Sequence, residues 1–166
     1  ILIPTRDRPG LTEDLIASIL EQNFTDFELI ISDNSTNNDT QEVLNKIEDR
    51  RVINYRTGNL NMADNWESGI DQCSGLYLLI FSDKMVLKKN SLEYLANYIA
   101  KYSPSCITWN IDSFFDKELT YFKNRSLKTV VRIEATSILK EILNSEFDSV
   151  KLPCHCNSAI AMSVIK

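Results

Sequence analysis

Glycine is scarce in this chain of 166 residues, and its placement excludes the common glycine-rich phosphate loops. The four glycines stand at positions 10, 58, 69 and 75. This spacing fits neither the G-x-G-x-x-G dinucleotide fingerprint nor a phosphate-binding P-loop. The chain also lacks a G-x-S-x-G nucleophile elbow. A Ser-His-Asp triad would have to use the single histidine, His155, and no sequence motif indicates which serine would be its partner. A phosphate-bearing ligand would need a different arrangement of donors.

Long apolar runs and an excess of positive charge are missing as well. The longest apolar run spans residues 76–81, whereas a transmembrane helix needs roughly 20 apolar residues. The formal net charge is −5, and proteins that bind nucleic acid usually present a basic face. We therefore expect no transmembrane segment in this chain and no nucleic-acid partner.

Cysteine is too sparse for a disulfide scaffold in a chain of this size. The four cysteines lie at positions 73, 106, 154 and 156. The segment Cys154-His155-Cys156 has metal-ligating residue types, but adjacent strand residues point to opposite faces and a fourth ligand is missing nearby. We expect buried or half-buried thiols rather than a metal site.

Apolar runs of strand type alternate with helical patterns along the first 110 residues. The expected strands are 1–3 (ended by Pro4), 27–32, 52–55, 76–81 and 106–109. The expected helices are 11–22, 39–46, 62–72 and one that follows Asn90, with capping boxes at Asp39/Glu42 and Asn90/Glu93. Repeated strand-then-helix units predict an α/β domain with a mostly parallel central sheet and helices on both faces.

The pattern is weaker beyond residue 110. There we expect a strand over 128–133, a helix over 134–144 and a strand over 158–165. Ligands of open parallel sheets gather beyond the carboxyl ends of the strands. The polar segments 5–8, 33–38 and 82–84 each follow a strand directly, and they are the predicted binding edge.

Several blocks of the sequence occur together in the order typical of one enzyme family. The blocks are ILIPTRDR at 1–8, SILEQ at 18–22, FELIISDNS at 27–35, NWE at 65–67, GLY at 75–77 and Ser82-Asp83. In this order they resemble the family-two glycosyltransferases, which are inverting enzymes of the Rossmann-like GT-A fold. The resemblance covers about residues 1–100.

The resemblance implies a three-layer α/β/α architecture and a division of labour along the chain. Residues 1–110 would form the nucleotide-sugar-binding region, and residues 111–166 would begin the acceptor side of the same domain. Because the chain starts at Ile1 inside an apolar run, we expect a piece of a longer protein. The implied setting is polysaccharide biosynthesis in the cytoplasm, with peripheral membrane association as a further expectation.

The resemblance also assigns nucleotide-binding roles to individual residues. A backbone turn at Pro4-Thr5 would lie against the base and ribose, and Arg8 would reach the base or a phosphate. Asp33 would accept the imino hydrogen bond of a uracil-like base, although an Asx turn that orders its own loop is the alternative. Asn65 would lie near the nucleoside, or else cap or pack its own helix.

The acidic metal motif of the family is incomplete here. The family carries two or three carboxylates that hold Mn²⁺ or Mg²⁺ against the donor diphosphate. In this chain Asp83 is the one carboxylate of that run, and Lys84 and Met85 occupy the usual carboxylate positions. Asp83 and Lys84 are the predicted diphosphate residues, and Asp83 is the predicted metal ligand, for Mn²⁺ or Mg²⁺ held mainly by phosphate oxygens and water. The alternative to a metal is that Lys84 supplies the charge in its place, unless Lys84 simply faces solvent.

These residues favour transfer of a sugar from a nucleoside-diphosphate sugar, of UDP type by preference, to a hydroxyl acceptor with inversion. The acceptor would be a glycan, a lipid-linked molecule or another hydroxyl compound. The alternative is a nucleotide-sugar-binding module that has lost catalysis together with its metal carboxylates. No general base stands out among Asp112, Asp116 and Asp148, so we expect the base to lie beyond residue 166 or to be absent. A nucleotidyltransferase and a phospho-acceptor receiver domain fit less well, since a glycine-rich loop and paired acids at the first strand tip are absent.

Overall fold

The structure is a computed structural model that describes residues 1–109 and 158–165. Its elements are β1 (Leu2–Thr5), α1 (Pro9–Leu20), β2 (Leu29–Asp33), α2 (Asp39–Leu44), β3 (Val52–Arg56), α3 (Met62–Asp71), β4 (Tyr77–Leu79), α4 (Ser91–Tyr102), β5 (Cys106–Thr108), β6 (Ser158–Ala161) and α6 (Met162–Ile165). The strand expected at 128–133, the helix expected at 134–144 and the segment Cys154-His155-Cys156 lie outside the described residues. None of the described helices is long and apolar enough to cross a bilayer.

The strands form one mixed layer at the centre of the molecule. β1, β2 and β3 pair in parallel in that order, and β4, β6 and β5 form a second group in which β6 runs antiparallel to both neighbours. A parallel bridge between Leu2 and Ile80 joins the two groups. The resulting strand order is β3-β2-β1-β4-β6-β5. The predicted α/β fold with a mostly parallel sheet is confirmed, with β6 as the antiparallel exception.

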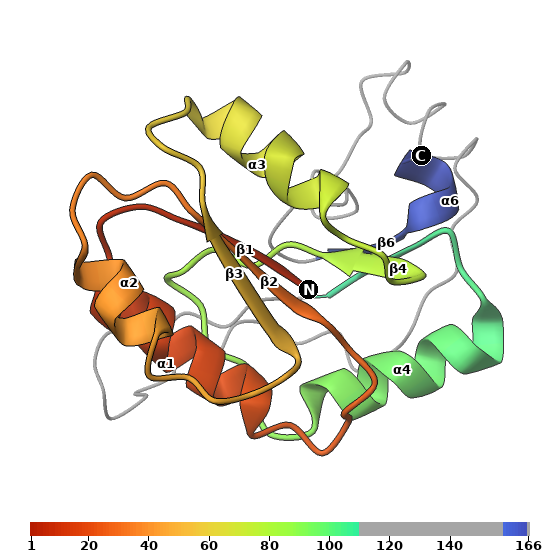
Figure 1. Ribbon diagram of the computed structural model, residues 1–166. Coiled ribbons are helices and arrows are strands. Elements are labelled where there is room, and N and C mark those ends of the chain that lie inside the picture. The colour runs from red at the N-terminus through yellow and green to blue at the C-terminus, as the bar shows by residue number, and fades with distance from the viewer. Residues whose placement is uncertain (110–157, 166) are drawn as a thin grey trace, which may run out of the picture.

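Helices cover both faces of this layer (Figure 1) because the strand residues alternate in direction. Ile3 and Ile31 pack with apolar residues of α1, α2 and α4, including Ile16 and Leu44. Their even-numbered neighbours contribute to a second cluster on the other face, where α3 and α6 lie. The second cluster consists of Leu2, Ile30, Cys73, Leu78 and Met162. Two apolar faces on β1 and β2 explain why both strands are buried throughout.

The first strand runs through Pro4, so the prediction that Pro4 ends it is wrong. The carbonyls of Ile1 and Thr5 accept hydrogen bonds from the β2 side, whereas the Leu2 carbonyl accepts from Phe81. Because bonding direction alternates along a strand, the missing N–H of Pro4 faces the side of β4 and costs no bond to β2. The chain turns after Thr5 rather than at Pro4-Thr5.

The predicted capping boxes are also wrong. Asn38, not Asp39, precedes the first residue of α2, and its side chain makes no capping hydrogen bond. Asn90 does precede α4, but it has a left-handed backbone with φ of 64° and its side chain does not cap the helix. Instead, Asn90 Oδ1 accepts from Asn23 Nδ2 at 2.8 Å. A side-chain contact to a distant loop has replaced the local one.

Two further differences concern helix α3 and the end of the chain. The Asn61 side chain caps α3 by accepting from the Asp64 N–H at 3.0 Å, a cap that the sequence pattern left unmarked. The strand expected over 158–165 is half helix, because β6 ends at Ala161 and α6 follows.

Glu28 fastens the start of β2 to the turn before β4. Its carboxylate accepts from Ser74 Oγ at 2.8 Å and from the Gly75 N–H at 2.9 Å, as well as from the Ser74 N–H. Partial burial acts to raise the pKa of Glu28, but these hydrogen bonds outweigh it and hold the pKa below the usual 4.5.

Replacing Glu28 by glutamine should lower the free energy of unfolding at pH 7 by about 1 kcal/mol, since the charge-assisted hydrogen bonds are partly screened by solvent. A lowered folded-state pKa means that this contribution is complete above pH 4.5 and disappears as the pH falls through the folded value. Urea unfolding at pH 7 and pH 3 measures the effect, and the gap between the two proteins should narrow at pH 3. Glu13→Gln, at an exposed position of α1, is the matched control. An equal gap at both pH values would contradict this account of Glu28.

Candidate functional site

The loop after β1 is fastened to the loop after β2 at the carboxyl edge of the sheet. Asp7 has a left-handed backbone with φ of 55°, and its N–H donates to Ser35 Oγ at 2.9 Å. Its carboxylate accepts from the Thr36 N–H at 2.7 Å. This backbone hydrogen bond is the main cause that lowers the pKa of Asp7 below its usual 3.8. Arg6 Nε lies 3.8 Å from Asp7 Oδ2, and Arg6 Nη2 donates to Asn59 Oδ1. Arg6 thus links the loop after β1 to the loop after β3.

Asp83 lies buried where the chain leaves β4, and side chains from the β1 edge occupy both of its oxygens. Arg8 Nη1 donates to Oδ1 at 3.0 Å, and Thr5 Oγ1 donates to Oδ2 at 3.1 Å. The Asp83 side chain is 3% exposed, whereas that of Arg8 is 46% exposed. The structure thus brings together three of the predicted site residues, which the sequence separates by up to 78 positions.

Thr12 supports this contact from the first turn of α1. Its hydroxyl lies 2.8 Å from the Thr5 hydroxyl and 2.9 Å from the Arg8 carbonyl. Sequence reasoning missed Thr12, although the signal was available: it is the polar member of the buried face that includes Leu15, Ile16 and Ile19. A hydroxyl on an otherwise apolar helix face commonly marks a buried hydrogen-bond network.

Asp33 ends β2 and is fully buried, with 0% exposure. Its Oδ1 accepts from the Ser35 N–H at 3.0 Å, which is the Asx turn named as the alternative for this residue. Its Oδ2 accepts from Gln41 Nε2 at 2.8 Å. Sequence reasoning also missed Gln41, because no local pattern pairs a helix residue with a strand end eight positions earlier. A carboxylate has about four acceptor sites, so these two bonds leave capacity for a further donor.

Neighbouring polar residues hold the loop after β2 in place. Asn34 Oδ1 accepts from the Leu60 N–H at 2.8 Å, which ties this loop to the one after β3. Arg56 Nη2 donates to the carbonyls of Ser35 and Asn37 at 3.0 and 2.7 Å. The predicted binding edge therefore consists of loops that share many hydrogen bonds with one another.

Asn65 joins α3 to the sheet beneath the site. Its Oδ1 accepts from Ser32 Oγ at 2.7 Å and from Thr57 Oγ1 at 2.8 Å, and its side chain is buried. These contacts correspond to the packing alternative for Asn65. Its predicted nucleoside contact stays a prediction.

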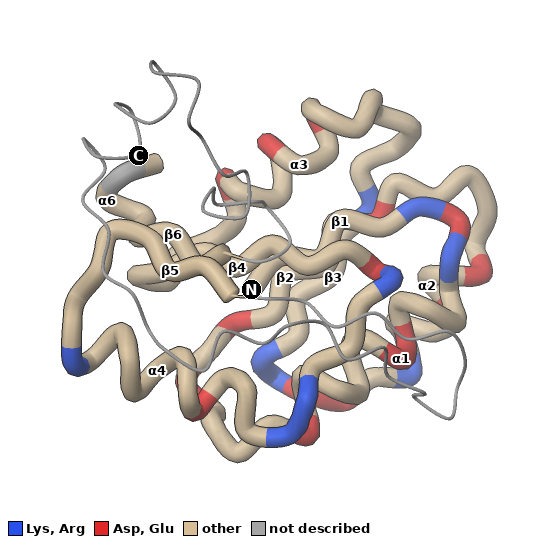
Figure 2. The backbone as a smooth tube through the Cα atoms, turned by 180° about the vertical axis from the view of Figure 1, so that it is seen from behind, with Lys and Arg blue, Asp and Glu red and all other residues tan. Residues whose placement is uncertain are grey.

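Charges of both signs are interspersed over the loops and helices in the described part of the chain (Figure 2). Lys84 is exposed at the edge and follows Asp83 directly, while Met85 is partly buried against the core. Within residues 1–109 and 158–165, no group of three or more Asp, Glu, His or Cys residues is arranged to hold a metal ion. Among the described residues, Asp83 is the one carboxylate of its run, whereas a divalent cation prefers several oxygen ligands. The predicted metal-binding role of Asp83 stays a prediction.

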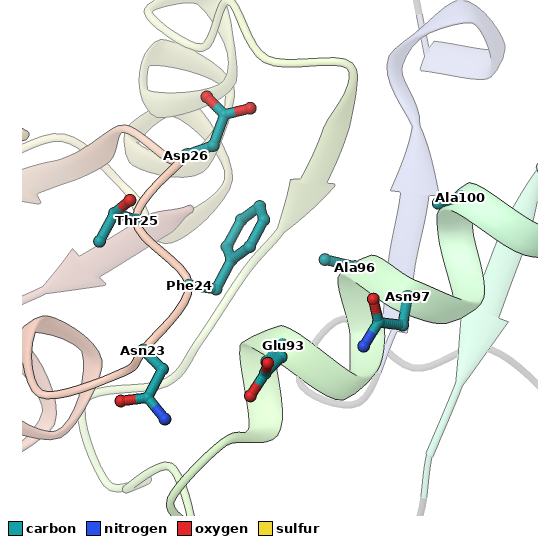
Figure 3. A pocket seen from close by; sticks show the side chains of 8 residues that line it. All are labelled: Asn23, Phe24, Thr25, Asp26, Glu93, Ala96, Asn97 and Ala100. Atoms are coloured by element: carbon teal, nitrogen blue, oxygen red, sulfur yellow. The ribbon is translucent and has the colours of Figure 1, made fainter.

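A groove of about 460 Å³ lies elsewhere, between the loop that precedes β2 and helix α4 (Figure 3). Phe24 points into it from the loop, opposite Ala96 of α4, and Asn23 and Glu93 stand at one end. This groove is near the start of β2, whereas the predicted residues are near its end. Its lining contains none of the predicted site residues.

A comparison with known protein families agrees with this architecture. The sequence model of glycosyl transferase family 2 matches residues 1–166. The chain belongs to glycosyltransferase family 2. The predicted family and its GT-A fold are thereby confirmed.

Named relatives of this family-2 chain are longer glycosyltransferases. A GalNAc(5)-diNAcBac-PP-undecaprenol beta-1,3-glucosyltransferase of Campylobacter jejuni is 31% identical over 99 residues, which cover 57% of this chain and 32% of that protein. A PGL/p-HBAD biosynthesis glycosyltransferase of Mycobacterium bovis is 26% identical over 113 residues, or 66% of this chain and 44% of that protein. The matched regions span less than half of either relative.

Solved structures support the fold. The Staphylococcus aureus TarS fragment 1–349 in complex with UDP-GlcNAc superposes with a TM-score of 0.61 at 18% identity, covering 66% of this chain and 33% of that chain. The mannosyltransferase PcManGT of Pyrobaculum calidifontis, in complex with GDP-Man and Mn²⁺, gives a TM-score of 0.57 at 15% identity. This match covers 66% of this chain and 34% of that chain. At these identities the likeness concerns the fold alone.

Proposed function

We propose that this chain is the donor-binding part of a glycosyltransferase that moves a sugar from a nucleoside-diphosphate sugar to a hydroxyl acceptor with inversion. The observation that carries the proposal is the convergence of Thr5, Arg8, Asp33 and Asp83 at the carboxyl edge of a family-2 sheet. Open parallel sheets bind their ligands at this edge. A uridine nucleotide is favoured because the Asp33 carboxylate suits the imino N–H of uracil.

In this proposal the nucleoside lies over β1 and the loop after β2. Pro4 and Thr5 would form the floor of the nucleoside pocket. Asn65 would support this floor indirectly, through its hydrogen bonds with Ser32 and Thr57. The base N–H would either join the two donors already on Asp33 or replace Gln41 on Oδ2, with the loop residues moving aside because Asp33 is fully buried.

The acceptor and the setting are proposed from the relatives. One relative is named for a lipid-linked undecaprenol substrate, so a lipid-linked or glycan hydroxyl is a reasonable acceptor class. A cytoplasmic location with peripheral membrane association would suit such chemistry. The candidate bases Asp112, Asp116 and Asp148 lie outside the described residues.

A binding module without catalysis is the second candidate, and the missing carboxylates at Lys84 and Met85 favour it. Release of nucleoside diphosphate from a sugar donor by the complete protein separates the two candidates. Turnover supports the transferase, and tight donor binding without turnover supports the binding module.

A thermal-shift panel of UDP, GDP, TDP and their sugars tests donor binding by the chain itself. A ligand at a hundred times its dissociation constant adds about 2.7 kcal/mol to the free energy of unfolding. For a domain of this size, that gain should raise Tm by roughly 5 to 10 °C. A rise with one nucleotide series supports the proposal, and an unchanged Tm with every nucleotide would contradict it.

A further inference from the structure

The inference concerns how the charge of the donor diphosphate is balanced, and it rests on the proposed function. In the described residues the only carboxylate of the metal-motif run is Asp83, and its two oxygens are engaged by Arg8 and Thr5. A metal ion at Asp83 would either share the buried carboxylate with a guanidinium 3.0 Å away, against the repulsion between two cations, or displace that guanidinium. Separating such a pair leaves a buried charge uncompensated, which is costly.

Arg8 has donors to spare at the same place. A guanidinium carries five N–H donors in a planar fork that matches phosphate oxygens. Within the described part of the chain, Arg8 donates to Asp83 through Nη1 alone. Its side chain is 46% exposed at the carboxyl edge of the sheet, so the remaining donors can reach a ligand there.

Lys84 adds a second cation beside this pair. It is exposed and follows Asp83 directly, at the position where the family pattern has a further carboxylate. The Met85 N–H donates to the Ser82 carbonyl at 3.0 Å, which closes a turn around Lys84. The edge thus presents cations at the place where family members present metal-binding acids.

We propose that Arg8, held in place by Asp83, binds the diphosphate of the donor directly and that Lys84 assists, so that donor binding does not require a divalent metal ion. Asp83 is then a positioning residue for Arg8 rather than a metal ligand. Two threonines help to hold this pair in place. Thr5 donates to the second carboxylate oxygen of Asp83, and Thr12 donates to the backbone carbonyl of Arg8.

Isothermal titration of the whole chain with uridine and UDP, each in EDTA and in Mn²⁺, tests this directly; guanosine and GDP are titrated in the same way. The diphosphate gain is the ratio of the affinity for the diphosphate to that for the nucleoside. In EDTA, Arg8→Ala should reduce this gain by about 10- to 100-fold, as expected for charge-assisted hydrogen bonds, with little change in nucleoside affinity. Lys84→Ala should reduce it by about 2- to 5-fold. Arg50→Ala and Lys89→Ala, at exposed positions, are the charge-matched controls.

Asp83→Asn separates the positioning role from a metal-binding role. If Asp83 positions Arg8, Asp83→Asn should lose part of the diphosphate gain in EDTA. Arg8→Lys should recover part of the gain that Arg8→Ala loses. The double variant Asp83→Asn/Arg8→Ala should lose little more of the gain than Arg8→Ala alone. A diphosphate gain that appears only with Mn²⁺ and disappears in Asp83→Asn would overturn the inference and leave the proposed function intact. Absence of binding by every nucleoside and nucleotide would overturn both.

Discussion

Replacing Asp33 by asparagine should weaken binding of UDP by about 10- to 100-fold while leaving the free energy of unfolding within about 1 kcal/mol of the original. The charge on Asp33 is what strengthens a hydrogen bond from the uracil N–H. Asparagine has nearly the same shape, so its oxygen can still accept from the Ser35 N–H, and the Gln41 amide can turn to match the new NH₂ group.

The stability of this variant follows from the surroundings of Asp33. The buried carboxylate has two neutral donors, Ser35 and Gln41, and no salt bridge among the described residues. Removing a buried charge without a counter-ion should cost little and can stabilise the fold. Asp39→Asn, at an exposed position in the adjacent helix, is the matched control. Titration calorimetry and urea unfolding measure both effects, and unchanged UDP affinity in Asp33→Asn would remove Asp33 from the binding site.

Replacing Gly69 by alanine should lower the free energy of unfolding by about 1 to 3 kcal/mol, because overpacking a filled core forces side chains out of place. A Cβ atom at this position of α3 would lie 2.5 Å from Leu2 Cδ1, and Leu2 is fully buried in β1. Leu2 would have to change rotamer within the cluster that joins α3 to the sheet.

Gly10 provides an unusually direct control for this substitution. It also lies in a helix, α1, but a Cβ atom there would meet nothing within 4 Å. Gly10→Ala should therefore stabilise the chain by up to about 1 kcal/mol, since glycine is the poorer helix residue. Chemical unfolding of both variants measures the contrast. Equal changes in the two variants would contradict the close packing of α3 on β1.

Local patterns predicted much of the fold because the apolar periods are clear. The runs that became β1, β2 and β3 and the helical faces of α1, α3 and α4 needed no tertiary information. Two of the errors depend on how a residue lies relative to distant parts of the fold. Asn90 bonds to Asn23 instead of capping its helix, and Pro4 stays in its strand because its missing N–H faces away from β2.

The gathering of the candidate residues at one edge of the sheet was predictable, but their contacts with one another were not. The strand-tip rule and the family resemblance selected Thr5, Arg8, Asp33 and Asp83, yet the ion pair between Arg8 and Asp83 spans 75 positions and has no local signature. The bond from Gln41 to Asp33 is hidden for the same reason. Long-range pairing of polar side chains depends on how the strands are arranged. The local hydrophobic periodicity of a single sequence does not contain that information.

The most direct test of the central claim is to map where UDP binds by backbone amide chemical shifts of the isotopically labelled chain. The account predicts that the shifts cluster in residues 5–8, 33–36 and 82–84, at the carboxyl edge of the sheet. Shifts centred on residues 23–26 and 93–100, which include the groove of Figure 3, would contradict it.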